Sequence, residues 1–156
     1  MQHLVSRLKT RRGFTLVELA VVIVIIGVLA AFGVPKFLQS VEKSKATEAF
    51  NYWSAVQSAE ERYIAQNGVY WDTSTAAPLP TTLDIVLPTL QYFDMTSITA
   101  TNPGGGLPTW TGILTRKTGT SSYGGYTVGW TQEGFSSTNS TIPQTISPVT
   151  GDAAGS

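Results

Sequence analysis

The hydrophobic and polar residues divide the chain into a uniformly apolar stretch, an amphipathic stretch and a polar remainder. No charged residue occurs from Leu19 to Val34, and the apolar stretch reaches back to Phe14 apart from Thr15 and Glu18. As a helix, the residues from Phe14 to Val34 would extend about 32 Å, close to the thickness of the hydrocarbon layer of a bilayer. We therefore expect a helix that can span a membrane.

After Pro35 the pattern becomes amphipathic, because apolar residues recur at intervals of three and four, the spacing of one helix face. Asn67 and Gly68 suit the left-handed geometry that ends a helix. The pattern predicts that the helix continues to about residue 67, roughly 80 Å from Phe14. The apolar face comprises Phe37, Leu38, Val41, Ala46, Ala49, Phe50, Trp53, Val56, Ala59 and Tyr63. The charged residues between them, Lys43, Lys45, Glu48, Glu60, Glu61 and Arg62, suit solvent-facing or intersubunit positions.

The polar remainder predicts short strands. Residues 72–106 are rich in Thr, Pro and Gly, and we expect a connecting loop with a helical turn and one strand at 95–101. The clearest strands are predicted at 109–115 and 123–131, joined by a turn-rich segment. Residues 136–156 are rich in Ser, Thr, Pro and Gly, which predicts an irregular surface lobe or loose tail.

The second clear strand has an apolar face that can cover the helix. Aromatic and branched side chains alternate there with threonine and glycine, so that they share one side of the strand. We expect an α+β fold in which one long helix rests on a small antiparallel sheet. The helix-to-sheet core is predicted from Phe50, Trp53, Val56, Tyr63, Tyr126, Val128 and Trp130.

Charge and composition exclude several classes of site. Four basic residues and no acid lie in residues 1–13, so six basic and ten acidic residues, a balance of about −4, remain in the rest of the chain. Without a basic cluster there, nucleic acid binding is not predicted. The absence of cysteine excludes disulfides and thiolate metal sites, and the single histidine, His3, excludes an imidazole-rich site.

Catalysis is not predicted either. Neither a cysteine nor a histidine in the body of the chain is present to act as a nucleophile or base. The glycines of residues 102–108 are not followed by the Lys-Ser/Thr pair of a phosphate-binding loop. The neighbouring carboxylates Glu60 and Glu61 point to different helix faces.

The apolar stretch has two simpler interpretations. A basic segment followed by an apolar run is typical of a secretory signal peptide, with a small-residue cleavage site at 31–33. An ordinary single-pass anchor would explain the length equally well. Neither accounts for Glu18, whose carboxylate is costly inside a bilayer unless an opposite charge compensates it. The nearest basic residues, Arg11, Arg12 and Lys36, lie outside the stretch.

Residues 11–35, "RRGFTLVELAVVIVIIGVLAAFGVP", resemble the N-terminal processing and assembly segment of type IV pilins and pseudopilins. The resemblance implies a pilin-like α+β fold and cleavage after Gly13 by a membrane prepilin peptidase and methyltransferase, followed by N-methylation of Phe14. It also implies that Glu18 meets the N-terminal amine of a neighbouring subunit and so sets the register of assembly. The alternative is a carboxylate that is tolerated near the headgroups.

Three residues interrupt the apolar helix, namely Gly27, Gly33 and Pro35. Proline removes a backbone hydrogen bond and each glycine weakens a helix, so a bend or local melting is expected there. Family members have a similar arrangement, and their helix stretches at this place when it is packed in a filament. The alternative is an ordinary proline kink where the helix leaves the membrane.

The resulting division of the chain has five parts: a basic leader (1–13), a transmembrane and assembly helix (14–35), an amphipathic helix (36–67), a loop with antiparallel sheet (68–135), and a C-terminal lobe or tail (136–156). Type IV pilins often close the last region with a disulfide, which this chain cannot form. Major pseudopilins often bind calcium there, but only Glu133 and Asp152 are acidic after Asp94, so a cage would need mostly backbone carbonyls. No metal or other cofactor is predicted.

The resemblance implies a structural subunit of a type IV pilus-like filament. Its partners would be copies of itself in a helical filament, the prepilin peptidase and methyltransferase, an inner-membrane assembly platform, and the bilayer before assembly. The basic leader predicts a cytoplasmic N-terminus and a C-terminal domain outside the cytoplasm, later part of an extracellular or periplasmic filament. The alternatives are a major pseudopilin of a type II secretion or DNA-uptake apparatus, and a membrane-tethered or secreted binding module.

Overall fold

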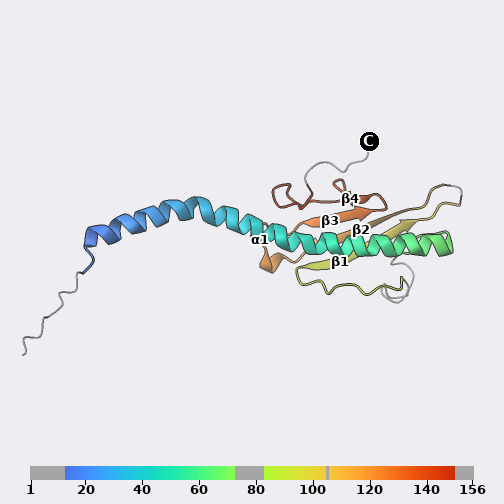
Figure 1. Ribbon diagram of the computed structural model, residues 1–156. Coiled ribbons are helices and arrows are strands. Elements are labelled where there is room, and N and C mark those ends of the chain that lie inside the picture. Colours follow the sequence, from blue (N-terminus) through green and yellow to red (C-terminus); the bar gives the residue numbers. More distant parts are fainter. Residues whose placement is uncertain (1–12, 73–82, 105, 150–156) are drawn as a thin grey trace, which may run out of the picture. The chain divides into compact units, whose positions relative to one another are not determined.

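The computed structural model describes residues 13–72, 83–104 and 106–149 of the 156-residue chain (Figure 1). The chain divides between Phe37 and Leu38 into two compact units. One helix, α1 (Leu16–Asn67), contributes to both units and is continuous across Pro35. It ends where the sequence predicts, because Gly68 adopts a φ of 75° and its N–H donates to the carbonyl of Ile64 at 2.8 Å.

The remaining elements form one antiparallel sheet of four strands in the order β1-β2-β3-β4. The elements are β1 (Phe93–Thr101), β2 (Thr109–Arg116), the 3₁₀ turn η1 (Thr118–Thr120), β3 (Thr127–Thr131) and β4 (Gly134–Ser136). Each strand pairs with the next along the chain, and β1 carries an irregularity between Met95 and Ser97. The expectation of an α+β fold with a long helix and a small antiparallel sheet is confirmed.

The secondary structure differs from the expectation in several places, and β1 begins at Phe93 rather than at 95. β3 begins at Thr127 rather than at 123, because Gly124 takes a φ of 72° that ends extended pairing. β4 is a strand that the sequence did not indicate, since three residues are too few for a recognisable alternation. A turn rather than a helix occupies 83–84, and no helix lies between 83 and 92; residues 73–82 of the predicted loop lie outside the described residues.

The segment after β4 is not a loose tail over residues 137–149. The backbone N–H of Thr141 donates to the carbonyl of Thr127 in β3 at 3.1 Å. The backbone N–H of Thr127 in turn donates to the side-chain hydroxyl of Thr141 at 2.8 Å. Ser140 accepts from the N–H of Gly129 at 2.8 Å, and Ile146 is fully buried. The segment is thus an irregular lobe anchored to β3. Residues 150–156 of the predicted tail lie outside the described residues.

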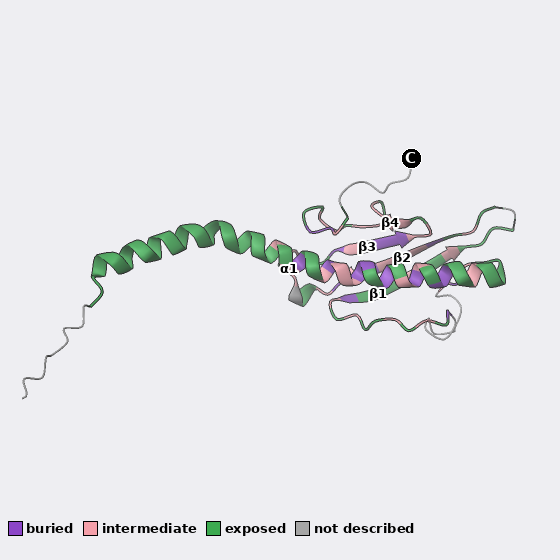
Figure 2. Cartoon of the chain, in the orientation of Figure 1, coloured by how far each residue is buried: buried purple, intermediate pink, exposed green. Residues whose placement is uncertain are grey.

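The core lies between the second half of α1 and one face of the sheet (Figure 2). Trp53 is fully buried and sits over Gly112 of β2, where any side chain would overlap its ring. The Trp53 indole N–H donates to the carbonyl of Val128 on β3 at 3.1 Å. One tryptophan therefore fixes the helix against two strands, and a glycine at the facing position makes room for it.

Candidate functional site

The start of α1 places a carboxylate at the first turn of an exposed helix. Gly13, Phe14 and Thr15 precede the helix. The backbone N–H and the hydroxyl of Thr15 donate to Oε2 of Glu18 at 2.9 and 2.7 Å, and the Glu18 N–H donates to the Thr15 hydroxyl at 3.2 Å. This reciprocal pair is a capping box, which satisfies otherwise unpaired N–H groups of the first turn. Glu18 thus has an uncharged polar partner within its own chain.

The rest of this segment exposes apolar side chains. All residues from 13 to 38 are exposed (Figure 2), and Phe14 is 81% exposed. Among the described residues, α1 is the one helix long and apolar enough to cross a membrane, and the apolar window that qualifies it has no buried residue. A helix that is apolar on all sides needs lipid or other helices around it. The large apolar side chains concerned are Phe14, Leu16, Val17, Leu19, Val21, Val22, Ile23, Val24, Ile25, Ile26, Val28, Leu29, Phe32, Val34, Phe37 and Leu38.

Gly27, Gly33 and Pro35, for which the sequence predicts a bend or local melting, lie within this exposed segment. α1 continues through Gly27, Gly33 and Pro35 without a break in its helical assignment. A Cβ atom added at either glycine would meet nothing within 4 Å. Neither glycine is therefore required by packing within the chain, in contrast to Gly112.

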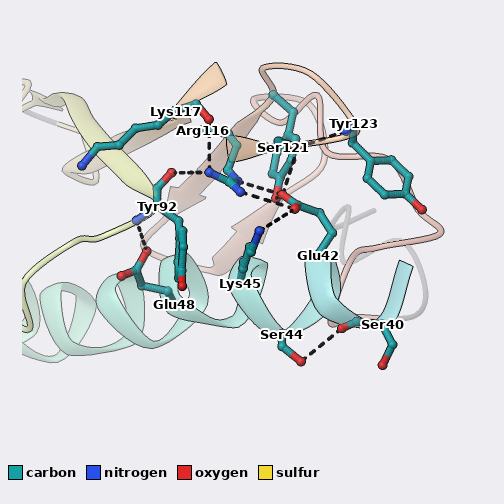
Figure 3. A network of polar contacts seen from close by, with 11 residues as sticks. Ser40, Glu42, Ser44, Lys45, Glu48, Tyr92, Arg116, Lys117, Ser121 and Tyr123 are labelled. Atoms are coloured by element: carbon teal, nitrogen blue, oxygen red, sulfur yellow. Dashed lines mark hydrogen bonds and ion pairs between the residues drawn. The ribbon is translucent and has the colours of Figure 1, made fainter. Parts of the chain in front are cut away.

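The second half of α1 contributes a buried carboxylate, Glu42, to a polar network with the sheet (Figure 3). The guanidinium of Arg116, at the end of β2, donates to both Glu42 oxygens, from Nε at 2.7 Å and from Nη2 at 3.3 Å. The hydroxyls of Tyr126 and Ser121 donate to Oε1 at 3.0 and 3.1 Å. Lys45 lies 3.8 Å from Oε2 on the solvent side. The network joins the helix to both ends of the segment that connects β2 to β3.

Burial and hydrogen bonding oppose each other in this network. Burial by itself would raise the pKa of Glu42, but the hydrogen bonds from Arg116 and Tyr126 and the charge of Arg116 outweigh it, and the pKa is lowered. Burial and then the Glu42 charge raise the pKa of Tyr126. Arg116 is further held by the carbonyls of Tyr92 and Lys117, at 3.0 and 3.1 Å. Glu42 and Arg116 are thus a charged, fully hydrogen-bonded pair.

The structure brings together the residues of the predicted helix-to-sheet core. Tyr63 is partly buried at the edge of this cluster. Phe50 stacks on Phe135 of β4 and meets the edge of Trp130, with ring centroids 5.2 and 5.6 Å apart. The buried members are Phe50, Trp53, Val56, Tyr126, Val128 and Trp130.

The burial of three ionisable side chains was not predicted from the sequence. Glu60 is fully buried, so its assignment to a solvent-facing or intersubunit position is wrong. Glu42 and Arg116 were not indicated. The signal was present, because Glu42 and Glu60 fall on the same helical face as Trp53, at spacings of eleven and seven residues, and Arg116 continues the inward alternation of β2. Charged side chains generally favour the surface, but at these positions the period of the helix or strand indicates burial.

No group of three or more His, Cys, Asp or Glu side chains in the described parts of the chain is placed to hold a metal ion. The chemistry that these residues offer is therefore that of packing, hydrogen bonding and one buried ion pair, together with an exposed apolar helix whose first turn carries a carboxylate.

Comparison with known proteins identifies the exposed segment. Residues 8–34 match the family model of the prokaryotic N-terminal methylation motif. The chain is 37% identical over 76 residues to the fimbrial protein EcpC of Eikenella corrodens, covering 49% of this chain and 50% of that protein. It is 41% identical over 69 residues to the type IV major pilin protein PilA of Myxococcus xanthus, covering 44% and 31%.

The N-terminal segment is similar to those of type IV pilins and pseudopilins. This pilin-like chain is also 38% identical over 65 residues to the type II secretion system core protein G of Vibrio cholerae, covering 42% of this chain and 44% of that protein. It spans about half or less of the length of these relatives. No solved structure matches it.

Proposed function

We propose that this chain is a structural subunit of a type IV pilus-like filament, without catalytic activity of its own, that assembles through the first half of α1 after removal of residues 1–13. The observation that carries the proposal is the uninterrupted exposure of apolar side chains from residue 14 to 38. The second half of the same helix buries its apolar face against its own sheet. The first half needs a partner outside the domain, which the bilayer supplies before assembly and other copies supply afterwards.

Processing would occur at the peptide bond between Gly13 and Phe14. Both residues are exposed and precede the first helical turn, so the bond is accessible to a membrane peptidase. The matched methylation motif supports Phe14 as the new N-terminus and as the residue that the peptidase and methyltransferase modifies. A free amine would then stand four residues before Glu18, at the same end of the helix.

Glu18 would set the register between subunits. Its Oε2 is engaged by Thr15, whereas Oε1 accepts no hydrogen bond from the described residues, so one oxygen is available to the amine of a neighbouring Phe14. In a medium of low dielectric constant, this pairing favours one axial position over others. Gly27 and Gly33, which no neighbour in the chain crowds, would allow helices of adjacent copies to approach closely.

The subunit would reside in the inner membrane as a single-pass protein with residues from 38 onward outside the cytoplasm. The basic residues of 1–13 support this orientation. From there an inner-membrane assembly platform would transfer it into an extracellular or periplasmic filament.

The alternative, a major pseudopilin of a type II secretion or DNA-uptake apparatus, is supported by the similarity to secretion core protein G of Vibrio cholerae. The N-terminal segment serves both functions equally. Electron microscopy of cells that express the chain separates them, because a pilin forms long surface filaments and a pseudopilin forms short periplasmic ones.

The mass of the mature N-terminus is the decisive test. We expect the purified chain to begin with methylated Phe14. A chain that retains residues 1–13 within assembled filaments would overturn the proposal. A start near Val34, or an intact Met1 without filaments, would instead support a secreted or membrane-tethered binding module.

Replacement of Glu18 tests the register. We expect Glu18→Ala to insert and be processed as the unchanged chain is, and to assemble few or no filaments, measured by sheared-filament yield. Glu61→Ala is the matched control, because it removes an exposed carboxylate from the other half of the same helix. Filaments of normal yield from Glu18→Ala would exclude the register role.

A further inference from the structure

The second half of α1 buries a further carboxylate, Glu60, that has no part in the proposed assembly. Its side chain is fully buried. Its Oε2 accepts a hydrogen bond from the backbone N–H of Trp71 at 3.1 Å, whereas Oε1 has no partner in the described parts of the chain. None of the ion pairs among the described residues includes it. A buried ionised carboxylate with so little compensation is costly, so these surroundings favour the neutral acid.

The residues that follow α1 add negative rather than positive charge. Asp72 is close enough to oppose ionisation of Glu60. The pKa of Tyr70 is raised by its burial and by the charges of Glu61 and Glu60. Residues 73–82 contain no charged side chain.

Within the part of the chain that the structure describes, the other neighbouring elements supply no compensating cation. On α1 itself, Arg62 is exposed and donates to the carbonyl of Ser58 at 3.1 Å. In β1 and β2 the charged residues, Asp94 and Arg116, lie at the opposite end of the strands from the β1–β2 turn. The turn between β3 and β4 carries Glu133, which is exposed and acidic.

These surroundings move the titration of Glu60 into the physiological range. Burial is the largest cause that raises its pKa, the Trp71 N–H lowers it, and the charge of Asp72 raises it again; the pKa rises from 4.5 to about 7. Glu42 is also buried, but Arg116 lowers its pKa. The two buried carboxylates of this helix therefore respond to pH in opposite directions.

We propose that Glu60 is a proton-dependent switch for the packing of Trp71 against the end of α1. With a neutral carboxyl group, Trp71 stays packed and 3% exposed. When the carboxyl group ionises, its buried and unpartnered oxygen gains hydration only if the packing around it opens. Trp71, whose backbone N–H binds the other oxygen of the same carboxyl group, is the neighbour that would move. Asn102 holds both the N–H and the carbonyl of Tyr70, at 2.9 and 3.1 Å, so Tyr70 stays in place and the opening begins at Trp71.

The direction of the pH dependence follows from proton linkage. Between pH 4.5 and about 7 the folded chain binds more protons at Glu60 than the unfolded chain does. The stabilisation is fully present below 4.5 and is lost as the pH rises through about 7. For these two values, the folding equilibrium constant falls roughly 70-fold between about pH 5 and about pH 8.

The experiment compares three forms of the full chain in detergent micelles: the unchanged chain, Glu60→Gln and Glu61→Gln. Gln is nearly isosteric with the neutral acid and cannot ionise. Denaturant unfolding at about pH 5, 6, 7 and 8 gives the folding equilibrium constant. Acrylamide quenching of tryptophan fluorescence, with Trp71→Phe to assign the signal, reports local opening.

We expect the unchanged chain and Glu61→Gln to lose stability and to expose Trp71 as the pH rises, and Glu60→Gln to do neither. A Glu60→Gln profile identical to that of the unchanged chain, or a flat profile for the unchanged chain, would overturn the proposal. If Glu60→Gln does not fold, Asp72→Asn replaces it: removal of that charge should move the midpoint to lower pH, and an unmoved midpoint would equally contradict the switch.

Discussion

The two halves of α1 share one backbone conformation but face two different environments. Up to Phe37 the helix exposes every side chain and is apolar on all sides. From Leu38 it buries one face, which carries Trp53 and two carboxyl groups, against the sheet. This comparison shows that the chain is helical both where its side chains are exposed and where one face is buried. The chain itself covers the apolar face of the second half, whereas in the proposed function the bilayer or other copies cover the first half.

Glycine illustrates the difference between the halves. At Gly112, beneath the second half, a Cβ atom would overlap the Trp53 ring, whereas at Gly27 it would meet nothing. At Gly112, packing inside the domain requires a small residue. At Gly27, a small residue would be required only when another helix approaches.

The largest expected effect is on the ion pair that joins the second half to the sheet. Glu42→Ala leaves the Arg116 charge buried without its partner, and we expect the free energy of unfolding to fall by about 3–5 kcal/mol. Denaturant unfolding of the full chain in micelles measures this. Because the folded pKa of Glu42 is lowered from 4.5, its stabilisation is present above that pH and is lost as the pH falls below it.

Two controls sharpen this result. Glu42→Leu with Arg116→Met should recover most of the stability, since an apolar pair can replace a buried ion pair. Lys117→Met removes the exposed pair with Asp94 and should change stability by less than about 1 kcal/mol. A loss for Glu42→Ala as small as that for Lys117→Met would show that the network is dispensable.

A pair of glycine replacements should separate the halves by a smaller effect. We expect Gly112→Ala to destabilise the domain by about 1–3 kcal/mol, because Trp53 must move. Gly27→Ala should leave the unfolding of the domain unchanged and lower filament yield. If both replacements destabilise the domain alike, the two halves are not independent.

The smallest expected effect concerns the first turn. Thr15→Val keeps the side-chain shape but removes the hydroxyl that donates to Glu18 and accepts from its N–H. We expect unchanged stability of the domain and a partial loss of filament yield, smaller than that of Glu18→Ala, measured on the same sheared-filament preparations. A loss equal to that of Glu18→Ala would mean that Thr15 itself contacts the neighbouring subunit.

Long periodic features were predictable from the sequence. The helix end at Asn67, the inward face of β3 and the core around Trp53 follow from spacing and capping alone, because many residues repeat the same signal. β4 and the anchored lobe could not be predicted, since short pairings such as Thr127 with Thr141 join residues whose local sequence resembles any polar loop.

The buried charges show where a rule of thumb outweighed a better signal. Glu42, Glu60 and Arg116 all lie in phase with buried apolar neighbours, so periodicity alone would have placed them inside. The general preference of charged residues for the surface argued otherwise. No sequence pattern reveals the partner of a buried charge. That Arg116 meets Glu42, and that Glu60 meets no cation among the described residues, depends on how the sheet packs against the helix.

The order of the strands has a consequence for how quickly the domain can form. Because each strand pairs only with its successor in the chain, the sheet closes short loops and can assemble without waiting for distant segments to meet. The helix then docks through contacts that are remote in sequence, such as that between Glu42 and Arg116. With no cysteine in the chain, this sequence of events needs no oxidative step, so we expect a domain that folds rapidly and without a disulfide-forming catalyst.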